Sequence, residues 1–175
     1  PLEDDVVADE PAVPQTQKAI FGFGNTGTRT GVSNLVNSSG VVAADVSAVG
    51  TARSNLAATT YGGDKAIFAF GVTQADSIVN TRNLVNNSGV IASDAGTARN
   101  ALAATTYGVG LGIFRGGADT YGMSNLVNTS GVVSADVTAV GTGRAASAGA
   151  SYGTDKGIFA YGWNDSSNYN MSNLV

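Results

Sequence analysis

Short apolar runs separated by turn-forming residues recur along the chain after residue 17. In one representative stretch these runs occupy residues 56–61, 66–70, 82–85 and 90–93. Val, Ile, Phe, Tyr and Thr fill the runs, and Gly, Asn, Asp and Ser separate them, which is typical of short β-strands. Helical spacing of apolar residues is not sustained over ~11 residues anywhere. The pattern therefore predicts an all-β protein.

The strand pattern belongs to an internal repeat. The segment Lys-Ala-Ile-Phe-Gly-Phe-Gly at 18–24 returns in altered form at 65–71, 111–117 and 156–162. Its first Phe recurs at intervals of 47, 46 and 45 residues. Asn-Leu-Val, Ser-Gly, Thr-Ala/Gly-Arg and Tyr-Gly segments keep the same register. A period of ~40–50 residues with four strands in each unit is typical of β-propeller blades.

The runs differ in a way that suggests their places within a blade. The Lys-Ala-Ile-Phe run is apolar on both faces, which suits a strand between two neighbouring sheets. The Leu-Ala-Ala-Thr-Thr-Tyr run consists of small residues, which suits an inner strand where sheets converge. We predict a β-propeller with four-stranded blades and an incomplete ring. Its blades would span 18–64, 65–110 and 111–155, with a partial blade at 156–175. Because propellers usually need ~4–8 blades, we expect either a fragment of a longer chain or two or more chains that together complete the ring.

The repeat unit resembles a kelch repeat. The resemblance lies in an Arg that enters a small-residue strand, then Tyr-Gly, then an Ile-Phe-x-Phe-Gly strand and a variable loop, and it covers residues 18–175. The double glycine that follows the second strand of kelch repeats stands only at Gly116-Gly117, and their Trp near the end of the unit is missing. The version with Asn-Leu-Val and Ser-Gly-Val-Val is similar to kelch-like arrays in virion proteins of tailed bacteriophages. This resemblance implies an exposed structural or attachment role.

Composition excludes several classes of function. The 175 residues include no Cys and no His, which excludes zinc fingers, haem or iron–sulfur ligation, Cys/His nucleophile pairs and disulfides. No apolar run approaches the ~18 residues of a membrane span, so we expect no membrane insertion. Residues 1–17 hold five of the 13 acidic residues and all three prolines, and are predicted to form a solvated arm or linker. The rest is nearly neutral and shows no basic patch, so no nucleic acid is expected as a partner. The start at Pro1 indicates a processed or trimmed chain.

The loops between the second and third strands vary, whereas the strands hardly change. These loops occupy 25–31, 72–80, 118–122 and 163–170. Divergent loops on a fixed scaffold are typical of a binding surface, although unconstrained drift would give the same pattern. The binding candidates are Arg29, Asp76, Arg115, Asp119, Tyr121, Trp163, Asp165 and Tyr169. Trp163 leads them because aromatic anchors dominate interfaces, and its alternative role is to shield the edge of an incomplete blade.

Two further sets of residues recur once in each unit and are predicted to be structural. They are Arg53, Arg99 and Arg144, and Asp45, Asp94 and Asp136. Each Arg could cap carbonyl groups of a neighbouring blade or pair with one of these Asp residues. The Asp residues precede turns, where a carboxylate commonly accepts local hydrogen bonds. One Asp in each unit falls short of the ~6–8 oxygens that calcium needs, so we expect no metal and no cofactor.

These observations favour a protein without catalytic activity. Without His, acid–base chemistry would depend on carboxylates, Lys or Tyr, and most acids outside the arm occupy equivalent turn positions. We expect a structural or binding module on a virion or cell surface that contacts a receptor, a glycan or neighbouring subunits. Its partners would be subunits of a larger assembly or further blades of the same chain. The alternative is a cytoplasmic kelch-type platform for protein interaction.

Overall fold

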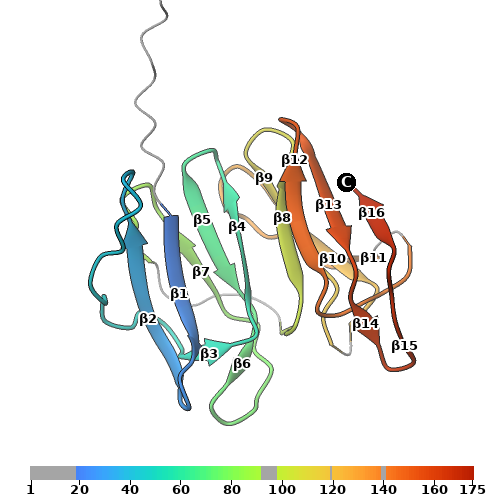
Figure 1. The fold of residues 1–175 in the computed structure, drawn as a ribbon, viewed down its shortest axis with the longest axis horizontal. Helices are drawn as coiled ribbons and strands as arrows, with labels where there is room; N and C mark the ends of the chain where they lie inside the picture. Colours follow the sequence, from blue (N-terminus) through green and yellow to red (C-terminus); the bar gives the residue numbers. More distant parts are fainter. Residues whose placement is uncertain (1–18, 92–97, 119, 139–140) are drawn as a thin grey trace, which may run out of the picture.

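The computed structural model describes residues 19–91, 98–118, 120–138 and 141–175. Sixteen β-strands and no helices lie in these residues, which confirms the all-β class (Figure 1). The described part of the chain contains no apolar helix of the length needed to cross a membrane. Short strands and frequent turns follow from β-branched and aromatic runs broken by Gly and Asn.

Four antiparallel sheets follow one another along the chain. The first contains β1 (Ala19–Asn25) and β2 (Arg29–Val36). The second contains β4 (Ala57–Tyr61), β5 (Lys65–Ala69) and β7 (Arg82–Val85). The third contains β8 (Ala103–Tyr107), β9 (Leu111–Arg115), β10 (Met123–Val127) and β11 (Val137–Thr138). The fourth contains β12 (Ala148–Tyr152), β13 (Lys156–Ala160) and β16 (Ser172–Leu174).

Two short ribbons lie beside these sheets. One pairs β3 (Arg53–Ser54) with β6 (Val72–Thr73), and the other pairs β14 (Trp163–Asn164) with β15 (Ser167–Asn168). Both ribbons lie at the lower edge of the molecule in Figure 1. Each includes part of a variable loop, so these loops contain regular hydrogen-bonded structure.

The strands agree with the apolar runs, but the repeat units are offset from the sheets. The runs at 56–61, 66–70 and 82–85 correspond to β4, β5 and β7. The fourth run, at 90–93, contributes one isolated bridge between Val85 and Ile91 in its described part. The hairpins β4–β5, β8–β9 and β12–β13 cross the unit boundaries after residues 64, 110 and 155. A sheet therefore takes its first strand from the end of one repeat unit and its other strands from the next.

Successive sheets pack on one another through their faces. The strands β4, β8 and β12, which contain the small-residue runs, lie next to each other in that order. Phe68, Val85 and Ile91 are buried against Ile20 and Phe23 of the first sheet. Phe114 and Val127 are buried against Ile67 and Phe70 in the same way, one sheet further on. The sheets do not close into a ring within the described residues.

Close approach between sheets explains where Gly replaces Ala in the second strand. A Cβ atom on Gly112 would lie 2.8 Å from Thr59 Cγ2, and one on Gly157 would lie 2.7 Å from Thr105 Cγ2. The equivalent positions in the first two sheets hold Ala19 and Ala66. The Thr side chains of β4 and β8 therefore occupy space that an Ala methyl group would need in the following sheet.

Replacement of Gly112 by Ala should destabilise the protein. The added methyl group would force Thr59 away from β9, and overpacking of this kind costs ~1–3 kcal/mol of unfolding free energy. The matched control is Gly122→Ala, because a Cβ atom at Gly122 has no neighbour within 4 Å. Urea denaturation of both variants measures the difference. Equal stability of the two variants would contradict the packing described here.

Candidate functional site

The variable loops and the connections between sheets lie together at one edge. The pairing of Arg53 with Thr73 and Ser54 with Val72 joins a connection to the second-sheet loop. Ala145 and Trp163 exchange backbone hydrogen bonds of 2.8 and 3.0 Å, which repeats this arrangement in the fourth sheet. Each connection therefore positions the beginning of the next variable loop.

An ion pair links the loops of the first and second sheets. The Arg29 guanidinium lies 2.8 Å from Asp76 Oδ1, and it also donates to the Ser54 hydroxyl at 3.1 Å and to the Thr73 carbonyl. The Arg29 backbone N–H donates to the Gln74 side chain at 2.9 Å. Because Arg29 already serves three acceptors, it fixes the two loops and leaves mainly the exposed Asp76 carboxylate for an external ligand.

Aromatic and polar side chains link the loops of the third and fourth sheets. The Tyr121 hydroxyl donates to Asp165 Oδ1 at 2.6 Å, and the Tyr121 and Trp163 rings meet edge to face with centroids 6.2 Å apart. The Asn164 amide donates to the Tyr169 hydroxyl at 2.9 Å. Trp163 remains 39% exposed. We call these five residues the aromatic cluster.

One predicted binding residue, Arg115, does not lie on the loop surface. Arg115 is only 3% exposed, and its guanidinium lies 5.7 Å from the Phe159 ring centroid, so it is not presented on the loop surface. Burial lowers its pKa, and the nearby positive charge of Arg144 lowers it further. The physical reason is its position: Arg115 ends strand β9 and turns toward the fourth sheet. Asp119 lies outside the described residues.

The repeated arginines span neighbouring sheets from buried positions. Arg53 donates to the Phe70 carbonyl at 2.8 Å and to Asn83 Oδ1 at 2.6 Å, while its guanidinium lies 4.0 Å from the Phe23 ring centroid. Arg99 repeats this contact one sheet later, 4.8 Å from the Phe70 ring centroid. Each of these two arginines thus covers an aromatic ring of one sheet and donates hydrogen bonds to acceptors of the next sheet.

Arg99 and Arg144 keep part of the hydrogen-bonding pattern of Arg53. Arg99 donates to the Gly116 carbonyl at 3.2 Å, and Arg144 donates to Asn173 Oδ1 at 2.8 Å. Burial lowers the pKa of Arg99, and the negative charge of Asp136 opposes this shift. Gly116 has no ring for Arg144 to cover, since the backbone of Arg144 itself occupies that space.

The repeated Asp residues contact the Asn of the Asn-Leu-Val segment. Asp45 accepts a hydrogen bond from Asn34 at 2.7 Å, and Asp136 accepts one from Asn125 at 2.7 Å. Asp94 lies outside the described residues. The sequence interpretation did not assign this Asn a role, although its exact recurrence with the Asp and the Arg was the available signal. The Asn amide can accept from an Arg through its oxygen and donate to an Asp through its nitrogen.

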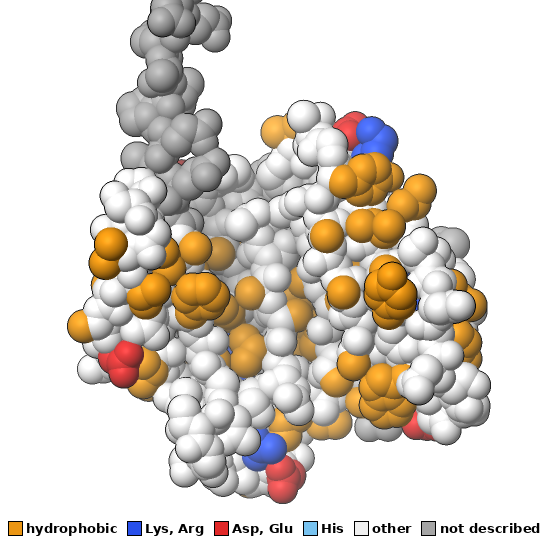
Figure 2. Space-filling model, viewed as in Figure 1, with side chains coloured by type: hydrophobic (Ala, Val, Ile, Leu, Met, Phe, Trp, Pro, Cys, Tyr) orange, Lys and Arg blue, Asp and Glu red, His pale blue; other side chains and the backbone are white. Residues whose placement is uncertain are grey.

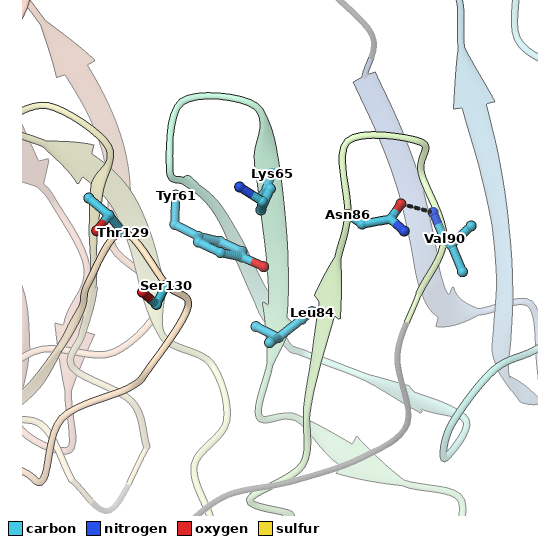
Figure 3. A pocket seen from close by; sticks show the side chains of 7 residues that line it. All are labelled: Tyr61, Lys65, Leu84, Asn86, Val90, Thr129 and Ser130. Carbon is cyan, nitrogen blue, oxygen red and sulfur yellow. Dashed lines mark hydrogen bonds between the residues drawn. The ribbon is translucent and has the colours of Figure 1, made fainter.

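A cavity lies between the second and third sheets, beside the hairpin turns. It has a volume of about 470 Å³ and is lined by Tyr61, Lys65, Leu84, Asn86, Val90, Thr129 and Ser130 (Figure 3). Burial raises the pKa of Tyr61, and the positive charge of Lys65 opposes this effect. Asn86 Oδ1 accepts backbone hydrogen bonds from Ser88 and Val90 and so shapes the turn at its edge.

The acidic residues of the loops are spread out. No group of three or more His, Cys, Asp or Glu residues that could hold a metal ion is present in the described ranges. Asp76 is bound to Arg29, and Asp165 is bound to Tyr121. These interactions indicate that the Asp76 and Asp165 carboxylates hold the loops in place.

Comparison with known proteins gives a likeness of fold. No family model matches the sequence, and no curated protein matches it. Among 122 solved chains that match is the structure of YjhT, with a TM-score of 0.62 and 12% sequence identity. The match covers 82% of this chain and 48% of YjhT, so this chain spans about half the length of that protein. At this identity the likeness concerns the fold alone.

Replacement of Arg53 by Ala should lower the free energy of unfolding by ~3 kcal/mol or more, because it leaves buried acceptors without a donor and the Phe23 ring uncovered. The control is Lys156→Ala, since the Lys156 ammonium is exposed and pairs with the adjacent, exposed Asp155. We expect the control to change stability by less than ~0.5 kcal/mol. Thermal and urea unfolding of both variants measure these changes. A loss of stability in Arg53→Ala as small as that of the control would show that Arg53 does not hold the sheets together.

Stability should fall at alkaline pH. Burial raises the pKa of Tyr61 and Tyr107 in the folded protein above the ordinary value of ~10. The unfolded chain therefore loses these protons first, and stability present below pH ~10 is lost as pH rises through the folded-state pKa values. Unfolding free energy measured against pH should decline less steeply in the Tyr61→Phe/Tyr107→Phe double variant. An unchanged slope would contradict the assignment to these two phenols.

Proposed function

We propose that this chain is a binding module without catalytic activity, built from β-propeller blades and displayed on a virion or a cell surface. In this proposal the aromatic cluster is the contact site for a glycan or a receptor. The observation that carries it is the exposed Trp163 ring, held by Tyr121 across two adjoining sheets and flanked by the Asp165 carboxylate.

Three features support the propeller architecture. Small antiparallel sheets follow one another along the chain, and each packs face to face on the next. The first strands of the last three sheets lie next to one another in the order β4, β8, β12, as expected when sheets radiate from an axis. YjhT shares the fold over 82% of this chain. The four sheets would then be an arc of a ring.

The chemistry of the aromatic cluster suits a saccharide. An exposed indole offers a flat apolar surface for the C–H face of a sugar ring, and nearby carboxylate and amide groups can bind hydroxyl groups. Asp165 supplies such a carboxylate, because it accepts a hydrogen bond from Tyr121, whose ring meets the Trp163 ring. The hydrogen bonds within the cluster hold it in place before binding, which reduces the entropy lost when a ligand binds.

An exposed location is supported by composition and by resemblance. Charged residues make up 13% of the chain, and 24 of its 175 residues are Gly, which favours an assembled coat or appendage. The similarity of the repeat to virion kelch-like arrays supports the same location. The alternative, an intracellular platform for protein interaction, rests on the kelch resemblance. Binding to intact cells supports the first, and capture of defined lysate proteins without cell binding supports the second.

A glycan array followed by titration with the best saccharide tests the proposed site. We expect Trp163→Ala to weaken binding at least tenfold, because it removes the stacking surface. The control, Lys156→Ala, alters an exposed residue at the beginning of β13, at the other end of that strand from the variable loop, and should bind like the parent chain. Loss of binding in both variants, or in neither, would contradict a site at the aromatic cluster. The absence of any binding to glycans or cells would contradict the proposed function itself.

A further inference from the structure

Equivalent Phe residues of the repeat have very different exposure. Phe68, Phe114 and Phe159 are 4%, 0% and 0% exposed, whereas Phe21 of the first sheet is 63% exposed. The buried members point back along the chain toward the preceding sheet. Phe68 meets Phe23 edge to face with ring centroids 5.4 Å apart, and Phe114 meets Phe70 at 5.2 Å. Phe21 therefore projects from the one described sheet that has no predecessor.

The fourth sheet, in turn, has no following sheet to cover its outer face within the described residues. Tyr152 is 41% exposed, whereas its equivalent Tyr61 is 4% exposed and packs in the cluster that contains Phe114. Tyr161 is 63% exposed and stands at the repeat position of Phe23 and Phe70, the rings that receive Phe68 and Phe114. Figure 2 shows frequent hydrophobic and few charged side chains over this part of the molecule.

The receiving residue is also held in the required conformation. Phe23, Phe70 and Tyr161 share a positive φ, of 63°, 68° and 59°. This left-handed conformation is unfavourable for an aromatic residue, and its recurrence in all three sheets indicates that the surrounding structure determines it. Tyr161 thus presents its ring from the same backbone conformation, without a Phe to contact it within the described residues.

We propose that these two faces bind each other between copies of this chain, with Phe21 of one copy packed edge to face on Tyr161 of the next. The two faces are the two halves of an interface that the chain already forms between its own sheets. A second copy is the occupant because this chain itself carries both halves. The exposed small residues of β12 would permit the close approach that β4 and β8 permit inside the chain.

The association would be head to tail, since the two contacting faces differ. Such an interface leaves one face of each kind free at the ends, so the copies either close into a ring or extend into a filament. The Phe21 half of this interface lies on the first sheet, whereas the aromatic cluster joins loops of the third and fourth sheets. The association therefore does not depend on ligand binding. The hydrophobic effect supplies its driving force, because Phe21, Tyr152, Tyr161 and Leu174 would all leave water.

Analytical ultracentrifugation of the complete chain over micromolar to millimolar concentrations tests the proposal. The parent chain should show mass that rises with concentration. Phe21→Asp and Tyr161→Asp should each be monomeric at every concentration, because each lacks one half of the interface. A control, Val109→Asp, changes a residue that is 87% exposed and should associate like the parent. Circular dichroism and thermal melting of the monomeric variants verify that they are folded.

Mixing the two variants gives the decisive result. Phe21→Asp keeps the Tyr161 face and Tyr161→Asp keeps the Phe21 face, so their mixture should form a dimer that grows no further. A parent chain that stays monomeric throughout, or a Tyr161→Asp variant that associates by itself, would overturn the proposal. Saccharide binding by monomeric Phe21→Asp would show that the two sites are separate, and Trp163→Ala should still associate.

Discussion

Each sheet of this protein is too small to bury its own apolar faces, and this constraint determines the rest of the structure. A sheet of two to four strands, most of them five residues long or less, becomes stable only when its neighbour covers it. The contact between Phe114 and Phe70 illustrates the solution, since one ring contributes ~1.5–3 kcal/mol of burial and also fixes the angle between two sheets. Glycines at positions 112 and 157 let the backbones approach closely enough for such contacts.

Polar interactions then determine how neighbouring sheets are aligned. Arg53 contacts a ring of the first sheet and acceptors of the second, so sliding of one sheet along the other would break several charge-assisted hydrogen bonds together. The Asn residues of the Asn-Leu-Val segments add further contacts, to an Arg at Asn83 and Asn173 and to an Asp at Asn34 and Asn125. The loop surface depends on that alignment, because Arg29–Asp76 and Tyr121–Asp165 each join loops of two different sheets.

Strand positions could be predicted from the sequence because runs of β-branched and aromatic residues and the turn residues between them act locally, as β4, β5 and β7 show. The burial of Arg115 could not, since an Arg after a strand reads as a loop cation until the neighbouring sheet is placed against it. The same holds for Phe23, Phe70 and Tyr161 at positive φ. Those positions lack the first glycine of a kelch pair, yet they keep the positive φ that Gly116 adopts at the equivalent position.

The β14–β15 hairpin combines independence with a fixed attachment. Its backbone hydrogen bonds and the Asn164 side chain order it internally, and the exchange of hydrogen bonds between Ala145 and Trp163 anchors its base. In a segment with these two properties, the sequence of the tip can change while the residues that anchor its base stay constant. Recognition could therefore diversify here by mutation or by grafting, at little cost to the folding of the sheets beneath.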